Sequence, residues 1–387
     1  MFKNIGRIIL FFSLLLFLFN STLSASDNTT IKEKTENVTF DFTYENMEDL
    51  FKDQISVNKD GEMILNIEKD LELEELLAQC KERGLKFGLA LGSGSARGLA
   101  HVGVIQVLEA YHIPIDVIAG TSIGSVVGSL YATGAPIKQL EEAALSIKKS
   151  STFFLMDPTF PRSGLISGNR IEKMLNKLGL RDKTFADLAI PFATVATDIE
   201  NGTKIILNQG SVIEAVRASI SIPGIFTPVK YQDYYLVDGG LIDPVPVDLV
   251  KQMGADITIA VSLVKINPSY TAVLMVNKET GNLEEVTEEP GASTPEKTSR
   301  LKRRIEQLKI KLESPNIFEV ISQSIDIMEA RITDQSLEGS DVVIIPFGIK
   351  DVHLFDFDKA EMLIKGGMMA SLINMPEIKK AIIRKLE

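Results

Sequence analysis

The sequence predicts an α/β fold of three layers, in which a mostly parallel central sheet is covered by helices on both faces. Two features of the chain after Leu85 predict it. Short runs that are apolar on both faces occur at 87–91, 115–119, 192–196, 257–264 and 342–345. Stretches of helical periodicity separate several of them, for instance at 99–111 and 171–178. Strands buried on both faces that alternate with helices are typical of a parallel sheet between helical layers.

The composition excludes several classes of function. The 387 residues are 45% hydrophobic, enough for a large core in one or two domains. A formal charge of −11 excludes nucleic acid as a partner, which needs a basic surface, and it restricts any membrane contact to a local, apolar one. The single cysteine, Cys80, excludes an internal disulfide framework, and the three histidines lack the spacing of metal ligands. We therefore expect neither a metal nor another cofactor.

The first residues have the layout of a secretory signal peptide. Lys3 and Arg7 precede an apolar run at 8–19, and small polar residues follow it. This layout predicts a signal peptide over 1–25, with cleavage after Ala25. The run is shorter than the roughly 20 apolar residues of a full membrane span, which favours cleavage over a retained anchor. We expect an exported protein (periplasmic, envelope-associated or secreted), with an uncleaved anchor as the alternative.

An acidic extension of unknown role, 26–84, precedes the predicted sheet. Its clearest element is a helix predicted over 71–81 and ending at Gly84. The main domain is expected over 85–375, followed by a C-terminal tail at 376–387.

One insert, at about 278–314, interrupts the main domain. Its first part, 278–297, is polar and glutamate-rich and is typical of an exposed loop. A helix with one apolar stripe is predicted over 298–313. A packed surface helix is the ordinary interpretation of that stripe, and a lid or membrane-contact element is the alternative.

The chemistry centres on Ser122, which lies in a G-x-S-x-G motif between Gly120 and Gly124. An apolar run precedes the motif and a predicted helix follows it, which is the layout of a nucleophile elbow. The glycines leave room for a tight turn, and the helix N-terminus stabilises negative charge that develops beside the hydroxyl. The pattern predicts a serine hydrolase.

The base that would activate this serine is not a convincing histidine. In such elbows the histidine follows the nucleophile, and only His353 does so, within an acidic and aromatic segment. His101 and His112 precede the serine. A Ser-His-Asp arrangement through His353 stays open as an alternative.

An acidic residue is better placed to be the base. Asp238 ends a predicted strand and is followed by Gly239 and Gly240. A carboxylate can take a serine proton directly where desolvation raises its basicity. Capping a turn is the other common role of an Asp-Gly pair.

A glycine-rich loop follows the first strand of the main domain and leads into a helix. It carries Gly92, Gly94 and Gly98, and Arg97 lies within it. Such a loop offers backbone N–H groups to an anion. The glycine spacing and the lack of an acid after the next strand exclude dinucleotide binding. In a hydrolase, the loop would form the oxyanion hole.

Taken together and in this order, the glycine-rich loop, Gly-Thr-Ser-Ile-Gly and Asp-Gly-Gly resemble the patatin-like phospholipases. The likeness covers roughly 86–265 and, less strongly, 315–375. Further similar segments are Ala196-Thr197-Asp198, Ala215-Val216-Arg217-Ala218-Ser219, Pro223-Gly224-Ile225-Phe226 and Pro244-Val245-Pro246-Val247.

The resemblance implies roles for particular residues. It implies a Ser–Asp dyad without histidine, with Ser122 as nucleophile and Asp238 as base, and it maps the oxyanion amides to Gly94 and Ser95. Arg97 takes the basic position of the loop, where it would contact a lipid phosphate or brace the loop.

Three further positions of the loop region bear on the resemblance. His101 is interpreted as structural support. Ser93 and Ser95 replace glycines found in many members, which narrows the conformations open to the loop but leaves its amides in place.

The predicted function is therefore an exported lipid acyl hydrolase, of phospholipase A, lysophospholipase or carboxylesterase type. Its partners would be a phospholipid or other lipid ester and, transiently, a membrane surface. A catalytically silent relative that binds lipid or protein is the alternative of another class.

Overall fold

The structure is a computed structural model, and it describes residues 44–59, 63–147, 157, 164–264, 274–276, 283–285, 317–350 and 352–387. All of them belong to one compact unit, Phe42–Glu387. The predicted signal peptide, the predicted helix at 298–313 and most of the predicted loop at 278–297 lie outside these residues. Within that loop only β13 (Leu283–Glu285) is described, and it pairs antiparallel with β12 (Leu274–Val276).

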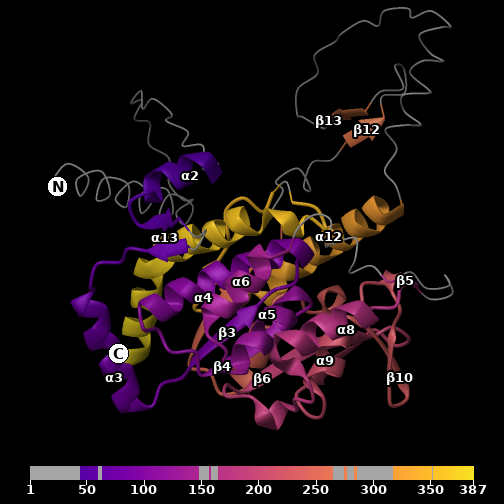
Figure 1. The fold of residues 1–387 in the computed structure, drawn as a ribbon, viewed down its shortest axis with the longest axis horizontal. Helices are drawn as coiled ribbons and strands as arrows, with labels where there is room; N and C mark the ends of the chain where they lie inside the picture. The colour runs from indigo at the N-terminus through magenta and orange to yellow at the C-terminus, as the bar shows by residue number, and fades with distance from the viewer. Residues whose placement is uncertain are drawn as a thin grey trace, which may run out of the picture. The chain divides into compact units, whose positions relative to one another are not determined.

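The centre of the fold is an eight-stranded sheet with the order β14-β11-β3-β4-β6-β10-β9, in which β7 also pairs with β6. Its strands β3, β4, β6 and β10 are labelled in Figure 1. Its parallel strands are β3 (Phe87–Leu91), β4 (Val117–Thr121), β6 (Phe192–Asp198), β11 (Ile257–Val261) and β14 (Val342–Ile344). Its antiparallel strands are β7 (Thr203–Leu207), β9 (Val229–Tyr231) and β10 (Tyr234–Asp238). The mostly parallel sheet is confirmed, and the antiparallel strands extend one side of it.

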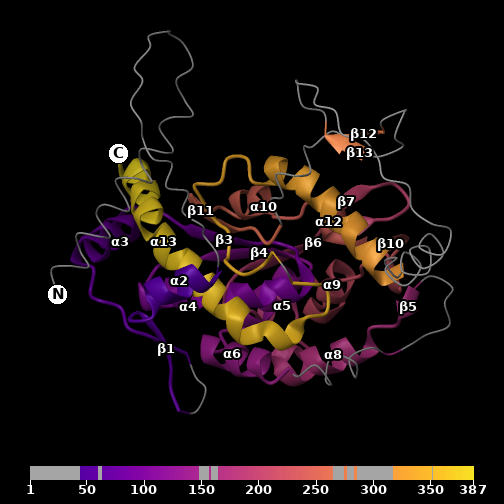
Figure 2. The same cartoon turned by 90° about the horizontal axis from the view of Figure 1, so that it is seen from above.

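Helices cover both faces of this sheet (Figure 2). One face packs against α4 (Ala100–Ala110), α5 (Ile123–Ala132) and α13 (Ala360–Leu386). The other packs against α10 (Val247–Gln252). Alternate residues of β3 divide between the two faces: Leu89 belongs to the first core and Ala90 to the second. This alternation explains why the strand is apolar throughout.

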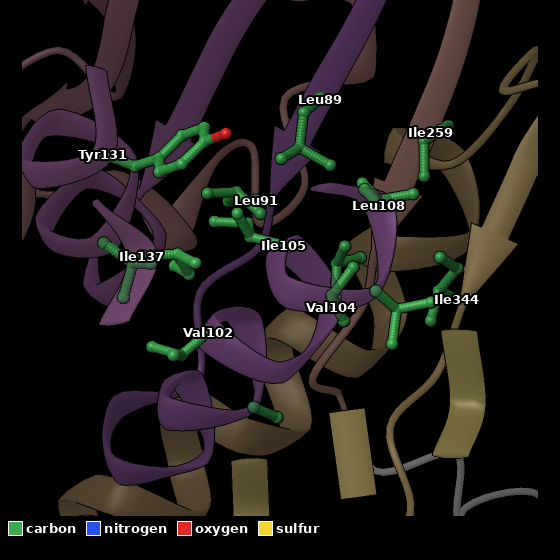
Figure 3. Packing of buried hydrophobic residues seen from close by; sticks show 14 of the residues in the cluster. Leu89, Leu91, Val102, Val104, Ile105, Leu108, Tyr131, Ile137, Ile259 and Ile344 are labelled. Atoms are coloured by element: carbon green, nitrogen blue, oxygen red, sulfur yellow. The ribbon is translucent and has the colours of Figure 1, made fainter. Parts of the chain in front are cut away.

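The first core is the larger one, and it lies between β3 and α4 (Figure 3). Leu89 and Leu91 point toward Ile105 and Leu108 of α4 (Figure 3). All four side chains are at most 1% exposed. Burial of four such side chains stabilises the fold by several kcal/mol, at about 1.5–3 kcal/mol each.

The remaining elements frame these layers. The helices are α2 (Tyr44–Phe51), α3 (Leu71–Arg83), α6 (Ile137–Leu145), α8 (Asn169–Leu175), α9 (Val212–Ser219) and α12 (Ile317–Ser336). Short helical turns are η1 (Ser95–Leu99), η2 (Asn176–Leu180), η3 (Phe185–Asp187), η4 (Gly239–Leu241) and η6 (Phe357–Lys359). Two small sheets pair β1 (Ile55–Val57) with β2 (Met63–Leu65), and β5 (Gly164–Ile166) with β8 (Gly224–Phe226). No described helix has both the length and the apolar character needed to cross a membrane.

The predicted helix at 71–81 is present as α3. Asp70 caps its start by accepting a hydrogen bond from the amide of Leu73 at 3.1 Å. Gly84 ends it with φ of +70°, a conformation that favours glycine. The 376–387 segment, which the sequence predicts as a tail, continues α13 and packs against α3.

Candidate active site

The nucleophile candidate, Ser122, lies on a sharp turn between β4 and α5. Its φ of +54° and ψ of −122° are rare for a residue with a side chain and are characteristic of a strained elbow. The amide of Ser122 donates to Oγ of Ser219 at 2.9 Å, and Oγ of Ser125 donates to the Ser122 carbonyl at 2.6 Å. These bonds offset the strain and hold the hydroxyl at the end of the strand.

The two glycines of the motif are required by close backbone contacts. A Cβ placed on Gly120 would lie 2.4 Å from the carbonyl oxygen of Gly124. A Cβ placed on Gly124 would lie 2.1 Å from the carbonyl oxygen of Leu91. Backbone atoms cannot yield as a flexible side chain can, so neither position has room for any other residue.

Strand register brings Asp238 beside Ser122. Thr121 pairs with Val195 of β6, so Ser122 falls level with Ala196, and Asp238 pairs with that same Ala196 from the other side. The Ser122 hydroxyl donates to Oδ2 of Asp238 at 2.6 Å. The structure thus brings together the two residues that the sequence singled out, although they are 116 positions apart.

The environment of Asp238 favours its protonated form more than water does. Asp238 is 4% exposed, and burial raises the pKa of its carboxyl to about 7. Hydrogen bonds from the Ser122 hydroxyl and the Gly240 amide act in the opposite direction and lower this pKa. The Gly240 amide donates to Oδ1 at 2.8 Å. A Cβ on Gly239 would lie 2.3 Å from the Val195 carbonyl oxygen, so glycine is needed there. The carboxylate is therefore oriented by one oxygen and faces Ser122 with the other.

The glycine-rich loop lies next to this pair and is fixed at its start. The amide of Gly92 donates to the Val261 carbonyl at 3.0 Å, and that of Ser93 donates to the Pro244 carbonyl at 2.8 Å. The amides of Gly94 and Ser95 have no hydrogen-bond partner in the part of the chain that the structure describes. They are the two that remain for an oxyanion.

The backbone of these two residues is unusual. Gly94 has φ of +152° and Ser95 has φ of +54°. The Ser95 hydroxyl donates to the carbonyl oxygen of Leu354 at 2.6 Å. This bond stabilises Ser95 in a backbone conformation that favours glycine.

Gly98 of the same loop is needed for a close contact, since a Cβ there would lie 2.3 Å from side-chain atoms of Ile123.

Arg97 is directed into the protein. It is 2% exposed, its guanidinium donates to the Leu263 carbonyl at 3.1 Å, and it forms an ion pair with Asp326 of α12. The sequence left two roles open for Arg97, contact with a lipid phosphate and bracing of the glycine-rich loop. These contacts are those of a residue that braces the loop. The guanidinium does not face solvent, where a lipid phosphate would meet it.

His101 and His353 bond to groups other than Ser122 and Asp238. His101 is fully buried, and its Nε2 lies 2.9 Å from the Gly92 carbonyl oxygen. Burial lowers its pKa to about 4, so it is neutral and supports the loop. His353 is exposed, and its amide donates to Oδ2 of Asp356 at 3.1 Å. No cluster able to hold a metal ion occurs among the described residues.

Three residues of the site's surroundings were not found from the sequence. Ser219 holds the elbow, while Asp326 and Glu329 reach the glycine-rich loop and the Asp238 turn from α12. A signal was present for the last two. They fall on the same helical stripe as Ile325 and Thr333, which marks them as carboxyls turned toward the interior.

Parts of the chain are similar to known proteins. Residues 89–251 match the model of the patatin-like phospholipase family. An uncharacterised NTE family protein of Mycobacterium tuberculosis is 40% identical over 182 residues, 46% of this chain and 49% of that protein. Patatin-like phospholipase domain-containing protein 6 of Homo sapiens is 34% identical over 46% of this chain and 13% of its own length. Lysophospholipase nte1 of Aspergillus fumigatus is 37% identical over 49% of this chain and 13% of its own length.

These matches support a patatin-like phospholipase family for the matched part of the chain. It spans about half the length of the mycobacterial relative and a small part of the human and fungal ones. Among solved structures, VipD from Legionella pneumophila aligns with 83% of this chain and 69% of its own, at 12% identity and a TM-score of 0.38. That likeness is too slight to carry an argument.

Proposed function

We propose that this protein hydrolyses acyl esters of lipids with a Ser122–Asp238 dyad. The observation that carries the proposal is the 2.6 Å hydrogen bond from the Ser122 hydroxyl to Asp238. A serine on a strained elbow, bonded directly to a buried carboxylate, is an arrangement for nucleophilic attack and not for structural support.

The proposed reaction has two steps. Asp238 takes the proton of Ser122 as its Oγ attacks the ester carbonyl, and the amides of Gly94 and Ser95 stabilise the oxyanion. The alcohol leaves with the proton from Asp238, and an acyl-enzyme remains. Asp238 then activates a water molecule, which releases the acid and restores Ser122. A base with a pKa of about 7 suits this work at neutral pH.

The substrate class is proposed from the family and the relatives. The family is described as patatin-like phospholipase, and the fungal relative is named a lysophospholipase. Both descriptions name phospholipids or lysophospholipids as substrates, so we infer that such lipids are substrates here and that the protein contacts a membrane surface transiently.

The test is a panel of defined phospholipids, lysophospholipids and neutral esters, with products identified by mass. Fatty acid release by the wild-type protein, absent from a Ser122→Ala preparation, is the expected result. Release of head groups without fatty acid, or no product from any lipid, would contradict the proposal.

We also propose that the protein is exported, on the basis of Lys3, Arg7 and the apolar run after them. Mature protein is expected to begin near residue 26 and to be found outside the cytoplasm. Amino-terminal sequencing of protein from separated cell fractions checks this, and an intact Met1 on soluble cytoplasmic protein would exclude it.

A further inference from the structure

A buried carboxyl that the proposed reaction does not use lies beside the dyad. Glu329, on α12, is 5% exposed. A Cβ placed on Gly240 would lie 2.0 Å from Oε1 of Glu329, so this oxygen contacts the glycine. Gly240 is the residue whose amide donates to Asp238. Glu329 therefore abuts the turn that orients the base.

The same helix also contacts the glycine-rich loop, whose Gly94 and Ser95 amides would form the oxyanion hole. Asp326, one turn before Glu329, forms an ion pair with Arg97. The Ser93 hydroxyl lies 3.1 Å from the Cβ that Gly240 would carry, next to Glu329. It makes no hydrogen bond of ordinary geometry within the described residues, but it lies close enough to the Glu329 carboxyl to lower its pKa. Glu329 of α12 therefore lies beside both the Gly239-Gly240 turn and the glycine-rich loop.

The groups facing Glu329 make its ionised form unfavourable. Burial raises its pKa to about 8, and the negative charge of Asp238 raises it as well. Ser93 and Arg97 lower the pKa of Glu329, and the charge of Asp326 raises it further. Because the charge of Asp238 acts on Glu329, the two carboxyls lose their protons in two coupled steps, the first leaving one negative charge and the second leaving two.

We propose that Glu329 is a positioning residue that works in its protonated form. Its neutral carboxyl supports the Gly239-Gly240 turn while Asp238 alone carries the negative charge. When Glu329 loses its proton, a second anion lies beside the base and the oxyanion loop. It then opposes the negative charge that develops on the substrate carbonyl oxygen, so the site loses activity at alkaline pH. This inference rests on the proposed function.

The test is the pH dependence of kcat/KM on a soluble ester, from about pH 5 to about pH 10, for wild type and Glu329→Gln. In the wild type we expect kcat/KM to fall about tenfold per pH unit on an alkaline limb. Glu329→Gln cannot ionise and should keep its activity there. The matched control is Asp334→Asn, which removes an exposed carboxylate from the same helix and should retain the wild-type limb.

A second measurement does not depend on activity. The raised pKa means that the folded state holds the Glu329 proton more tightly than the unfolded chain does. Stability from that proton is present at acid pH and is lost as pH rises through about 8. The difference in Tm between Glu329→Gln and wild type should therefore shift in favour of the variant as pH rises from about 5 to about 9. This shift should occur over about the same pH range as the change in activity. If the amide is not tolerated, Glu329→Met has similar size and also cannot ionise.

The outcomes separate the two proposals. A wild-type protein that cleaves no ester would refute the proposed function, while the Tm difference would still report on Glu329. An active wild type whose alkaline limb persists in Glu329→Gln or Glu329→Met would overturn the role of Glu329 alone. A Tm difference independent of pH would overturn it as well.

Discussion

The Ser95 hydroxyl donates a hydrogen bond to the carbonyl oxygen of Leu354, 259 positions further along the chain. The bond ties the segment before α13 to the loop whose amides face the proposed oxyanion. It also fixes a residue with φ of +54°, at which a bulky side chain is strained. The loop therefore depends on both the hydroxyl and the small size of Ser95.

Substitutions at Ser95 should separate these two effects. Ser95→Gly removes the hydroxyl but relieves the backbone, so we expect kcat/KM to fall no more than about tenfold, the value of one hydrogen bond. Ser95→Val adds β-branching at positive φ and should lower both Tm and activity further. Thermal unfolding and kinetics of the two variants check this, and equal behaviour would show that the backbone conformation is unimportant.

Ser122→Ala and Asp238→Asn should each abolish ester hydrolysis in a protein that still folds. The two residues act as one unit, so the double variant should be little slower than either single one. Rates on a soluble ester, with circular dichroism as the folding control, decide the point. Turnover near the wild-type rate in Asp238→Asn would remove the aspartate from the mechanism.

The acid side of the pH profile should belong to Asp238. Its anion is needed as the base, so kcat/KM should rise as pH increases through about 7. The stability of the fold should change with pH in the opposite direction to activity. Because burial raises the pKa of Asp238, its protonated carboxyl contributes to the free energy of unfolding at acid pH, and this contribution is lost as pH rises through about 7. Melting curves should show Asp238→Asn gaining on wild type by a few degrees toward pH 8, and a constant difference would contradict the raised pKa.

The sequence predicted the fold because its signals are local. Strands such as β3 and β6 are apolar on both faces, and Gly120 of the elbow is required by a contact with Gly124, four positions further on. The contact of Gly124 with Leu91 is long-range, but the G-x-S-x-G motif marks this glycine locally. One boundary differs from the prediction. The run predicted at 115–119 is a strand only from Val117, and the carboxylate of Asp116, just before it, accepts a hydrogen bond from the amide of Phe87 at 2.7 Å.

The contacts of α12 could not be predicted in the same way. Asp326 and Glu329 were visible as acidic residues on an apolar stripe, but their partners are set by where the helix docks. Arg97 lies 229 positions before Asp326, and no local pattern links them. The same holds for Ser219, whose hydroxyl accepts from the Ser122 amide across 97 positions. Long-range packing, and not residue type, gives these side chains their roles.

His353→Ala should retain activity within about tenfold of wild type, because no transition-state interaction is lost. The side chain is exposed, and its neighbour Leu354 contacts the oxyanion loop through a backbone carbonyl that the substitution preserves. Loss of the histidine of a catalytic triad lowers the rate far more, on the order of a million-fold in subtilisin. A folded but inactive His353→Ala protein would make this a histidine-dependent hydrolase.

Arg97 has two roles open from the sequence, bracing the loop and contacting a lipid phosphate. Its ion pair with Asp326 is buried, and removing one partner of such a pair leaves an uncompensated charge, at a cost of about 3–5 kcal/mol. Arg97→Met and Asp326→Leu should therefore each lower the free energy of unfolding by that order, and the double variant should lose less than the sum of the two. Denaturant unfolding of the four proteins measures this coupling.

Substrate choice then separates bracing from phosphate contact. A bracing Arg97 shapes the loop for every ester, so the folded fraction of Arg97→Met should lose activity equally on a phospholipid and on a neutral ester of the same acyl chain. An arginine that binds the phosphate contributes only to the first, because a charge-assisted hydrogen bond is worth about 1.5–3 kcal/mol, or roughly ten- to a hundredfold in kcat/KM. Asp326→Leu is the matched control, since it disturbs the brace without removing the cation. A loss confined to the phospholipid, and seen only in Arg97→Met, would turn Arg97 from a brace into a substrate contact.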